Sequence, residues 1–129
     1  MIENLIQNLI AISLGAMLFF SFVIAPVIFK VLDANNASKF VRKIFPHYYL
    51  INLIILSIVL LLFLYISSVN QDFYITLIIA ILFAFSLFIL MPLINKLKDN
   101  KEERKFKYSH LLSVIINFIQ IIGLIYLVF

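Results

Sequence analysis

Four long apolar stretches, separated by short polar segments, make up most of this chain. Their extent predicts helices over about residues 5–29, 46–66, 73–94 and 110–129. At a rise of 1.5 Å per residue, a helix of about 20 residues spans roughly 30 Å, the thickness of the hydrocarbon core of a bilayer. The pattern therefore predicts an all-α polytopic membrane protein, a bundle of four transmembrane helices that forms a single domain over residues 1–129.

Positive charge is confined to two of the segments between the apolar stretches. All ten Lys and Arg residues lie within residues 30–43 and 96–107. Loops rich in Lys and Arg remain on the cytoplasmic side of a membrane. We therefore expect residues 30–45 and 95–109 to form cytoplasmic loops, and both chain ends to face outward. In a bacterium this membrane would be the inner, or plasma, membrane.

The first basic loop has an amphipathic pattern of its own. Lys39, Arg42 and Lys43 alternate with apolar residues, as in a short helix that lies in the membrane interface. Such a helix either recruits anionic lipid or serves as an ordinary positive-inside anchor, and we favour the anchor. The second basic loop mixes acids and bases, which predicts a solvated extension of the adjoining helices.

Composition excludes several classes of protein. The chain is 65% hydrophobic and only 12% charged, whereas soluble domains contain about 25% charged residues. It has no cysteine, so disulfides and Cys-based zinc or iron–sulfur sites are excluded. The net charge of +4 does not indicate a nucleic-acid partner, because the positive-inside rule accounts for the basic residues. The partner that composition indicates is the lipid bilayer.

A short pattern, P-x-I-x-K-x-x-D, occurs twice at an offset of 66 residues. It begins at Pro26 and again at Pro92, in each case near the basic end of a predicted helix. We interpret it as an internal repeat of two helical hairpins that lie parallel to each other. Each proline removes a backbone donor, so a helix kink is expected at both positions.

Polar residues inside the predicted spans are few, and none near mid-span is charged. This argues against a proton-coupled exporter and against a voltage sensor, which need embedded charges. One group follows i, i+3, i+7, i+10 spacing and therefore shares one face of the last helix. That face should point into the bundle, with Asn52 of the second helix as its partner. The group consists of His110, Ser113, Asn117 and Gln120.

Two histidines are candidates for a metal or haem site. His47 and His110 are each placed in the first turn of a predicted helix, at the cytoplasmic end. Paired imidazoles can ligate haem iron or a transition metal, or relay protons. Interfacial packing is the alternative and the one we favour, so no resident cofactor is expected.

The order of several motifs resembles the transmembrane protein 205-like family over essentially the whole chain. The motifs are Ser21-Phe22…Pro26-x-x-Phe29, Phe45-Pro46-x-Tyr48-Tyr49, Pro92 and His110-x-x-Ser113-x-x-x-Asn117. Bacterial members of that family form a domain family of unknown function, and its eukaryotic relatives are linked to platinum-drug resistance. The resemblance extends distantly to copper-resistance D membrane domains and to the membrane haem-biosynthesis oxidase family. It implies a helical bundle and does not imply a particular chemistry.

Three functional hypotheses remain at this stage. The favoured one is a non-enzymatic protein of solute or metal transport, tolerance or membrane organisation. We expect it to be a homo-oligomer, because four short helices enclose little space. The alternatives are a haem- or metal-binding redox protein and a scaffold for another membrane protein. No acid–base pair, nucleophile or Gly-rich phosphate loop indicates an enzyme.

Overall fold

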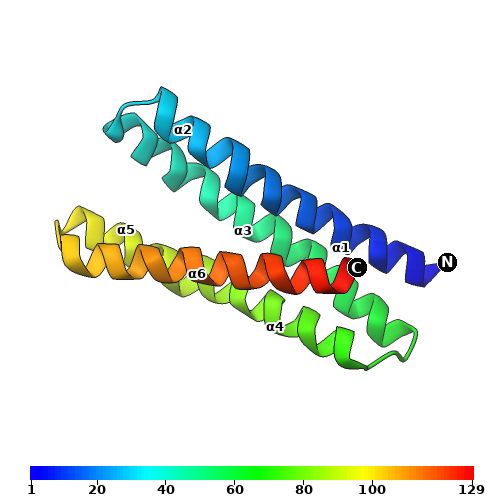
Figure 1. The fold of residues 1–129 in the computed structure, drawn as a ribbon. Helices are drawn as coiled ribbons and strands as arrows, with labels where there is room; N and C mark the ends of the chain where they lie inside the picture. Colours follow the sequence, from blue (N-terminus) through cyan, green and yellow to red (C-terminus); the bar gives the residue numbers. More distant parts are fainter.

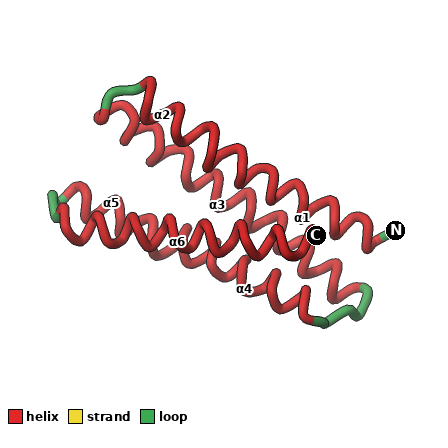
Figure 2. The backbone as a smooth tube through the Cα atoms, in the orientation of Figure 1, coloured by secondary structure: helices red, strands yellow, loops and turns green.

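The computed structural model describes residues 1–129 as four long helical rods joined by short turns (Figures 1 and 2). The first rod comprises α1 (Ile2–Phe19), the π-helical turn η1 (Phe20–Ile24) and α2 (Ala25–Val31). The second is α3 (Ala34–Tyr65). The third comprises α4 (Gln71–Phe85), a second π-helical turn η2 (Ser86–Leu90) and α5 (Met91–Asp99), and the fourth is α6 (Glu103–Val128). The predicted all-α fold is confirmed.

All four rods are long and apolar enough to cross a membrane. The shortest contains 26 residues, which corresponds to about 39 Å. In the most apolar window of each rod only 28% to 39% of the residues are buried inside the bundle. The remaining apolar surface would be unfavourable in water and is accommodated by lipid tails. The chain is a membrane protein.

The rods form two antiparallel hairpins, and α1 and α4 each pack against both α3 and α6. Figure 1 shows both chain termini and the α3–α4 turn at one end of the bundle, and the α2–α3 and α5–α6 turns at the other. We call the second of these the basic end, because the Lys and Arg residues gather there. The two hairpins separate toward the basic end (Figure 1).

The helices extend further into the basic segments than the hydrophobic pattern predicts. Residues 34–45, expected in a loop with a separate interfacial helix, form the first turns of α3 instead. Asp33 starts this helix early, because its side chain accepts a hydrogen bond from the Asn36 N–H at 2.8 Å. Pro46, expected in the first turn of a helix, therefore lies well inside α3. The second basic segment is also mostly helical, and only residues 100–102 connect α5 to α6.

The two prolines of the sequence repeat each follow a π-helical turn. The Ala25 N–H donates to the Phe20 carbonyl, and the Met91 N–H donates to the Ser86 carbonyl. Both bonds reach five residues back, and the two turns begin 66 residues apart, which is the offset of the repeat. A π turn inserts one extra residue into a helix, and such turns are frequent at functional sites. The repeat is therefore present in the backbone geometry as well as in the sequence.

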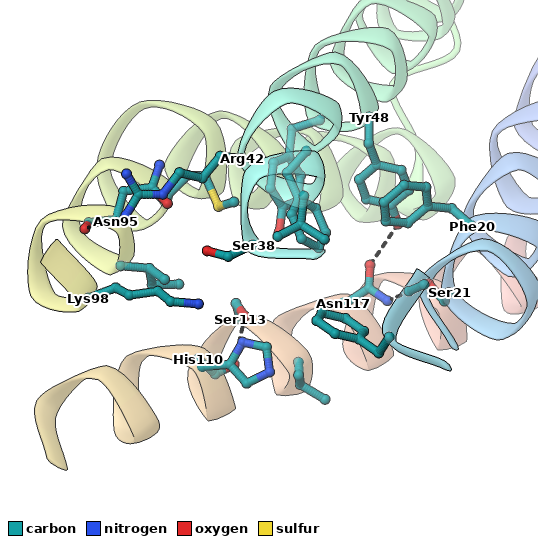
Figure 3. A pocket seen from close by; sticks show the side chains of 18 of the residues that line it. Phe20, Ser21, Ser38, Arg42, Tyr48, Asn95, Lys98, His110, Ser113 and Asn117 are labelled. Carbon is teal, nitrogen blue, oxygen red and sulfur yellow. Dashed lines mark hydrogen bonds between the residues drawn. The ribbon is translucent and has the colours of Figure 1, made fainter. Parts of the chain in front are cut away.

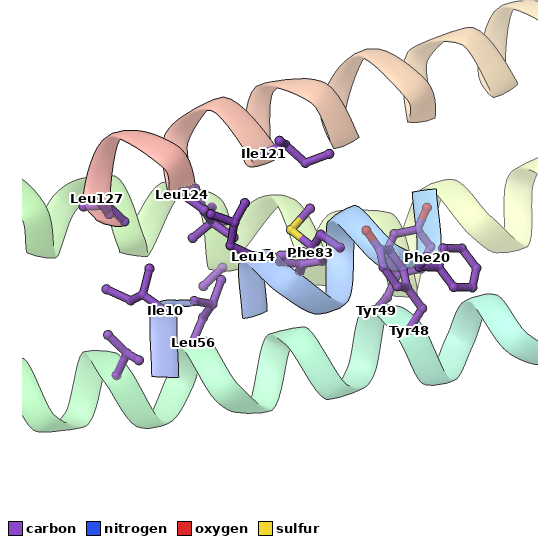
Figure 4. Close-up of a cluster of buried hydrophobic side chains, with 14 of the residues drawn as sticks. Ile10, Leu14, Phe20, Tyr48, Tyr49, Leu56, Phe83, Ile121, Leu124 and Leu127 are labelled. Atoms are coloured by element: carbon purple, nitrogen blue, oxygen red, sulfur yellow. The ribbon is translucent and has the colours of Figure 1, made fainter. Parts of the chain in front are cut away.

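The interior is tightly packed at mid-span and toward the chain termini, as Figure 4 shows. Met17, Leu56, Val59, Phe83 and Leu124 have no exposed surface. Gly123 allows α6 to approach α4, because a Cβ at this position would lie 2.7 Å from the Ile79 Cδ1 atom. Small residues at helix interfaces permit such close packing in membranes.

Candidate functional site: a cavity between the hairpins

A cavity of about 450 Å³ lies between the two hairpins near the basic end (Figure 3). This volume is within the range of about 300–1,000 Å³ that is typical of small-molecule sites. Its wall is mainly hydrophobic and aromatic. The polar side chains that line it are Ser21, Ser38, Arg42, Tyr48, Tyr49, Asn95, Lys98, His110, Ser113 and Asn117. We expected four short helices to enclose little space, but the separation of the hairpins leaves this cavity inside one chain.

An ion pair connects the hairpins at the mouth of the cavity. The Arg42 guanidinium on α3 forms a two-pronged bond with the Asp99 carboxylate of α5, and Nη1 lies 3.2 Å from Oδ2. Nη2 also donates to the Asn95 carbonyl at 3.1 Å. Asp99 is the last residue of α5, two positions after its last apolar residue, Leu97, and lies beyond the predicted apolar span of residues 73–94. The hydrogen bond from Arg42 holds the pKa of its carboxyl below the usual range.

Lys98, Phe106 and His110 form a second group near the mouth. The Lys98 Nζ lies 5.5 Å from the centre of the Phe106 ring, which places the cation over the aromatic face. The His110 imidazole stacks on the same ring, with centroids 6.0 Å apart. Lys98 takes part in no ion pair. The mouth therefore carries one neutralised cation, Arg42, and one free cation, Lys98.

Hydrogen bonds between three rods close the deep end of the cavity. The Tyr48 hydroxyl donates to Asn117 Oδ1 at 2.7 Å, and Asn117 Nδ2 donates to the Ser21 hydroxyl at 2.9 Å (Figure 3). Asn52 extends the network: it donates to the Tyr48 carbonyl at 2.8 Å and accepts from Ser13 at 2.7 Å. Because Ser21 belongs to η1, the network fixes the first π turn against α3 and α6.

Aromatic rings surround this deep end. The Phe20 ring stacks on Tyr48 with centroids 4.4 Å apart, and Phe45 packs edge-on against Phe20 at 5.2 Å. Tyr49 stacks on Phe45 at 5.9 Å. Tyr48 and Tyr49 are both buried. Their hydrophobic environment is supplied by the bundle, and Asn117 accepts a hydrogen bond from the Tyr48 hydroxyl.

The predicted polar face of the last helix divides between two environments. His110, Ser113 and Asn117 line the cavity, whereas Gln120 lies beyond its deep end. Gln120 is fully buried and donates to the Ile79 carbonyl at 3.2 Å, but its Oε1 atom has no partner. Asn52, the predicted partner of this face, bonds to Ser13 and Tyr48 instead. Asn117 and Asn52 are connected only through Tyr48.

The two histidines of the proposed metal or haem site lie in different surroundings. His110 is the eighth residue of α6 and His47 lies in the interior of α3, because both helices start earlier than predicted. His110 lines the cavity and His47 does not. No group of three or more His, Cys, Asp or Glu side chains is placed to hold a metal ion. A metal or haem site at the two imidazoles stays a prediction.

The predicted interfacial basic residues have different roles. Lys39 and Lys43 are exposed, whereas Arg42 is half-buried and reaches across to the other hairpin. Sequence reasoning missed Lys98 as a site residue, because it lies in a segment of mixed charge that reads as solvated. It also missed the inward position of Tyr48. Six residues separate Arg42 from Tyr48 on one helix, which leaves their side chains about 120° apart, so periodicity alone does not place them on one face.

Comparison with known proteins places the chain in a family. The model of a domain of unknown function, DUF4149, matches residues 8–103. An uncharacterized protein of Aquifex aeolicus (strain VF5) is 35% identical over 122 residues, which cover 89% of this chain and 85% of that protein. No solved structure matches this chain. The resemblance to the transmembrane protein 205-like family and to the copper-resistance D domains stays a prediction.

Proposed function

The chain belongs to the DUF4149 family of membrane proteins, and we propose that it binds a small solute in the cavity between its two hairpins. The solute would be held and released without being chemically changed, as part of transport or tolerance. The observation that carries this proposal is the cavity of about 450 Å³, which has polar groups from both hairpins. The orientation predicted from the positive charges places its mouth on the cytoplasmic side, in a bacterium that of the inner membrane.

The chemistry of the cavity wall supports binding rather than catalysis. The Ser113 hydroxyl donates to the backbone carbonyl of His110 at 2.6 Å, so it is not hydrogen-bonded to the imidazole as an activated nucleophile would be. No acidic side chain lines the cavity. The wall therefore lacks the paired carboxylates that glycoside hydrolases use as acid and base.

The two π turns support movement of the hairpins during binding. Each turn lies where a rod passes from the packed part of the bundle to the separated part. The π-helical geometry replaces the regular hydrogen-bond ladder, and the following prolines lack a donor, so the rods are most easily bent there. The solute would thus enter by a change in angle of α2 and α5 relative to the packed core.

A cysteine-accessibility experiment tests the water-accessible mouth that this proposal requires. The wild-type chain has no cysteine, so single variants need no further changes. Ser113→Cys places a thiol in the cavity, and Ser57→Cys places one on the exposed outer face of α3. In inside-out membrane vesicles, a membrane-impermeant maleimide should label the Ser113 variant and leave the Ser57 variant unlabelled. Equal labelling of the two, or none at Ser113, would refute an open vestibule.

A growth experiment tests the role in tolerance. Cells without the protein are compared with complemented cells across a panel of toxic amphiphilic solutes. Asn117→Leu removes the network at the deep end and should fail to restore tolerance, whereas Gln120→Leu, outside the cavity, should restore it. Both variants must first be shown to accumulate in the membrane. Full complementation by Asn117→Leu would count against the cavity as the working site.

A further inference from the structure

The charges that face the cavity are one-sided. Arg42 and Lys98 line it, and no Asp or Glu does. The charge of Arg42 is neutralised by Asp99, but the Lys98 ammonium has no acidic partner. The exposed Lys98 ammonium at the edge of this apolar cavity can form a charge-assisted hydrogen bond with an anionic group. The free Lys98 ammonium therefore indicates a negatively charged ligand.

The cavity is also polarised along the axis of the bundle. Figure 3 shows Lys98, Asn95 and Arg42 on one side, and Phe20, Tyr48 and Asn117 on the other. Arg42 and Tyr48 are six residues apart on one helix, which corresponds to roughly 9 Å along its axis. Aromatic rings surround the deep side. A ligand that satisfies both sides has a charged head and an apolar tail.

One wall of the cavity also faces the lipid. Phe22 of η1 and Phe118 of α6 line the cavity, and the two residues are 56% and 47% exposed. Their ring centroids lie 6.3 Å apart, so this aromatic pair spans the space between the two rods. Rotation of either ring would connect the cavity with the acyl region of the membrane. This is an entry route for molecules that dissolve in the bilayer.

We propose that the cavity binds an anionic amphiphile, whose carboxylate or phosphate contacts Lys98 and whose apolar chain lies among the aromatic rings of the deep end. This inference rests on the proposed function and specifies its ligand class. The same chemistry is offered by a free amphiphilic acid and by an anionic membrane lipid. In both cases the ligand enters between Phe22 and Phe118, and its head remains at the basic end.

Photolabelling in lipid nanodiscs tests this ligand class. The protein is reconstituted in phosphatidylcholine and exposed to decanoate that carries a diazirine at the end of its chain, and labelled peptides are identified by mass spectrometry. Labelling is expected on cavity residues at the deep end. Excess decanoate should compete, whereas decyltrimethylammonium, of opposite charge, should not. Nanodiscs doped with phosphatidylglycerol distinguish the sources: loss of labelling there indicates a lipid, and unchanged labelling indicates a free amphiphilic acid.

Two charge reversals on the same helix provide the control. Lys98→Glu changes a cavity residue, and Lys96→Glu changes an exposed residue two positions earlier that does not line the cavity. Loss of a charge-assisted contact should reduce labelling in Lys98→Glu by about tenfold. Labelling in Lys96→Glu should equal the wild type. Lys98→Gln removes the cation without adding a repulsive charge, so its labelling should lie between that of Lys98→Glu and that of Lys96→Glu.

The outcomes separate this inference from the proposed function. Equal labelling of the Lys98→Glu and Lys96→Glu variants, or equal competition by the ammonium, would overturn the anionic ligand and leave a solute-binding cavity in place. Absence of any cavity label, with Ser113→Cys still reactive toward maleimide, would overturn the amphiphile and leave a water-filled vestibule. Loss of the Ser113→Cys reaction would refute the proposed function itself.

Discussion

The two ends of this bundle are built from similar apolar sequences but differ in packing. From mid-span to the chain termini, Leu56, Leu124 and Leu127 are buried against one another, and Gly123 brings α6 close to α4. At the basic end the hairpins separate and enclose a cavity with polar side chains. The change occurs near the two π turns, which lie at equivalent positions of the repeat. The packed end holds the four rods together, whereas the basic end contains the cavity.

The largest difference between the ends is expected from a matched pair of leucines on α6. Leu124→Ala removes a side chain with no exposed surface, and Leu112→Ala removes one that is 43% exposed. In a membrane the substitution removes packing contacts but exposes no apolar surface to water. We therefore expect Leu124→Ala to lower the free energy of unfolding by about 2–3 kcal/mol. Leu112→Ala should stay within about 0.5 kcal/mol. Unfolding in mixed micelles of increasing dodecyl sulfate content, followed by circular dichroism, measures both. Similar losses would mean that the ends do not differ in packing.

A pair of glycines tests the close approach of α6 to α4. A Cβ at Gly123 would lie 2.7 Å from Ile79, whereas nothing lies within 4 Å of a Cβ at Gly15. Gly123→Leu should lower the free energy of unfolding by about 1–3 kcal/mol, because the larger side chain overpacks the contact with α4. Gly15→Leu should be neutral or slightly stabilising, because leucine is the better helix former. The same unfolding measurement decides, and destabilisation by Gly15→Leu would show that α1 has an unrecognised neighbour.

Substitutions of two amide residues on α6, Asn117 and Gln120, compare the contribution of the polar network to stability with that of the packed core. Asn117→Leu removes two side-chain bonds between rods and should cost about 1 kcal/mol, since such bonds average about 0.6 kcal/mol in membranes. Gln120→Leu removes one bond together with a buried oxygen that has no partner, so its net effect should be near zero. A larger loss of stability for Gln120→Leu than for Asn117→Leu would show that the Gln120 amide, and not the Asn117 network, stabilises the bundle.

The smallest expected effect on stability comes from the ion pair between Arg42 and Asp99 at the mouth of the cavity. The pKa of Asp99 is lowered in the folded protein, so the pair stabilises the fold above the ordinary carboxyl pKa of about 4 and loses its effect as the pH falls through the lower, folded value. The stability difference between wild type and Asp99→Asn should therefore be larger at pH 7 than at pH 3. A difference that does not change with pH would show that Asp99 makes no net contribution.

Much of the architecture could be predicted from the sequence, and the failures have identifiable causes. Apolar length and charge placement predict four spans, because a bilayer requires about 20 apolar residues per helix. The boundary near Asp33 was missed because a helix cap can extend a helix into a charged segment that hydropathy reads as loop. Pro26 and Pro92 were expected to kink their helices, but the resulting π turns depend on how the surrounding helices pack.

The candidate site could be predicted only in part. The spacing of His110, Ser113 and Asn117 places them on one face of a helix, and all three line the cavity. The partners of that face could not be predicted, because periodicity gives the direction of a side chain and not the identity of its neighbour. Asn52 was the expected partner of Asn117, but Tyr48 occupies that position.

The sequence by itself determined that this protein lies in a lipid bilayer, how many helices it has, and that it contains a repeat. These properties follow from local hydrophobicity, charge and proline placement. Only the tertiary structure decided that the hairpins separate at one end, that Arg42 is neutralised by Asp99, and that Lys98 remains free beside a cavity. The physical reason is that cavities and ion pairs depend on contacts between distant segments. Arg42 and Asp99 are 57 residues apart in the chain, and Ser21 and Asn117 are 96 residues apart.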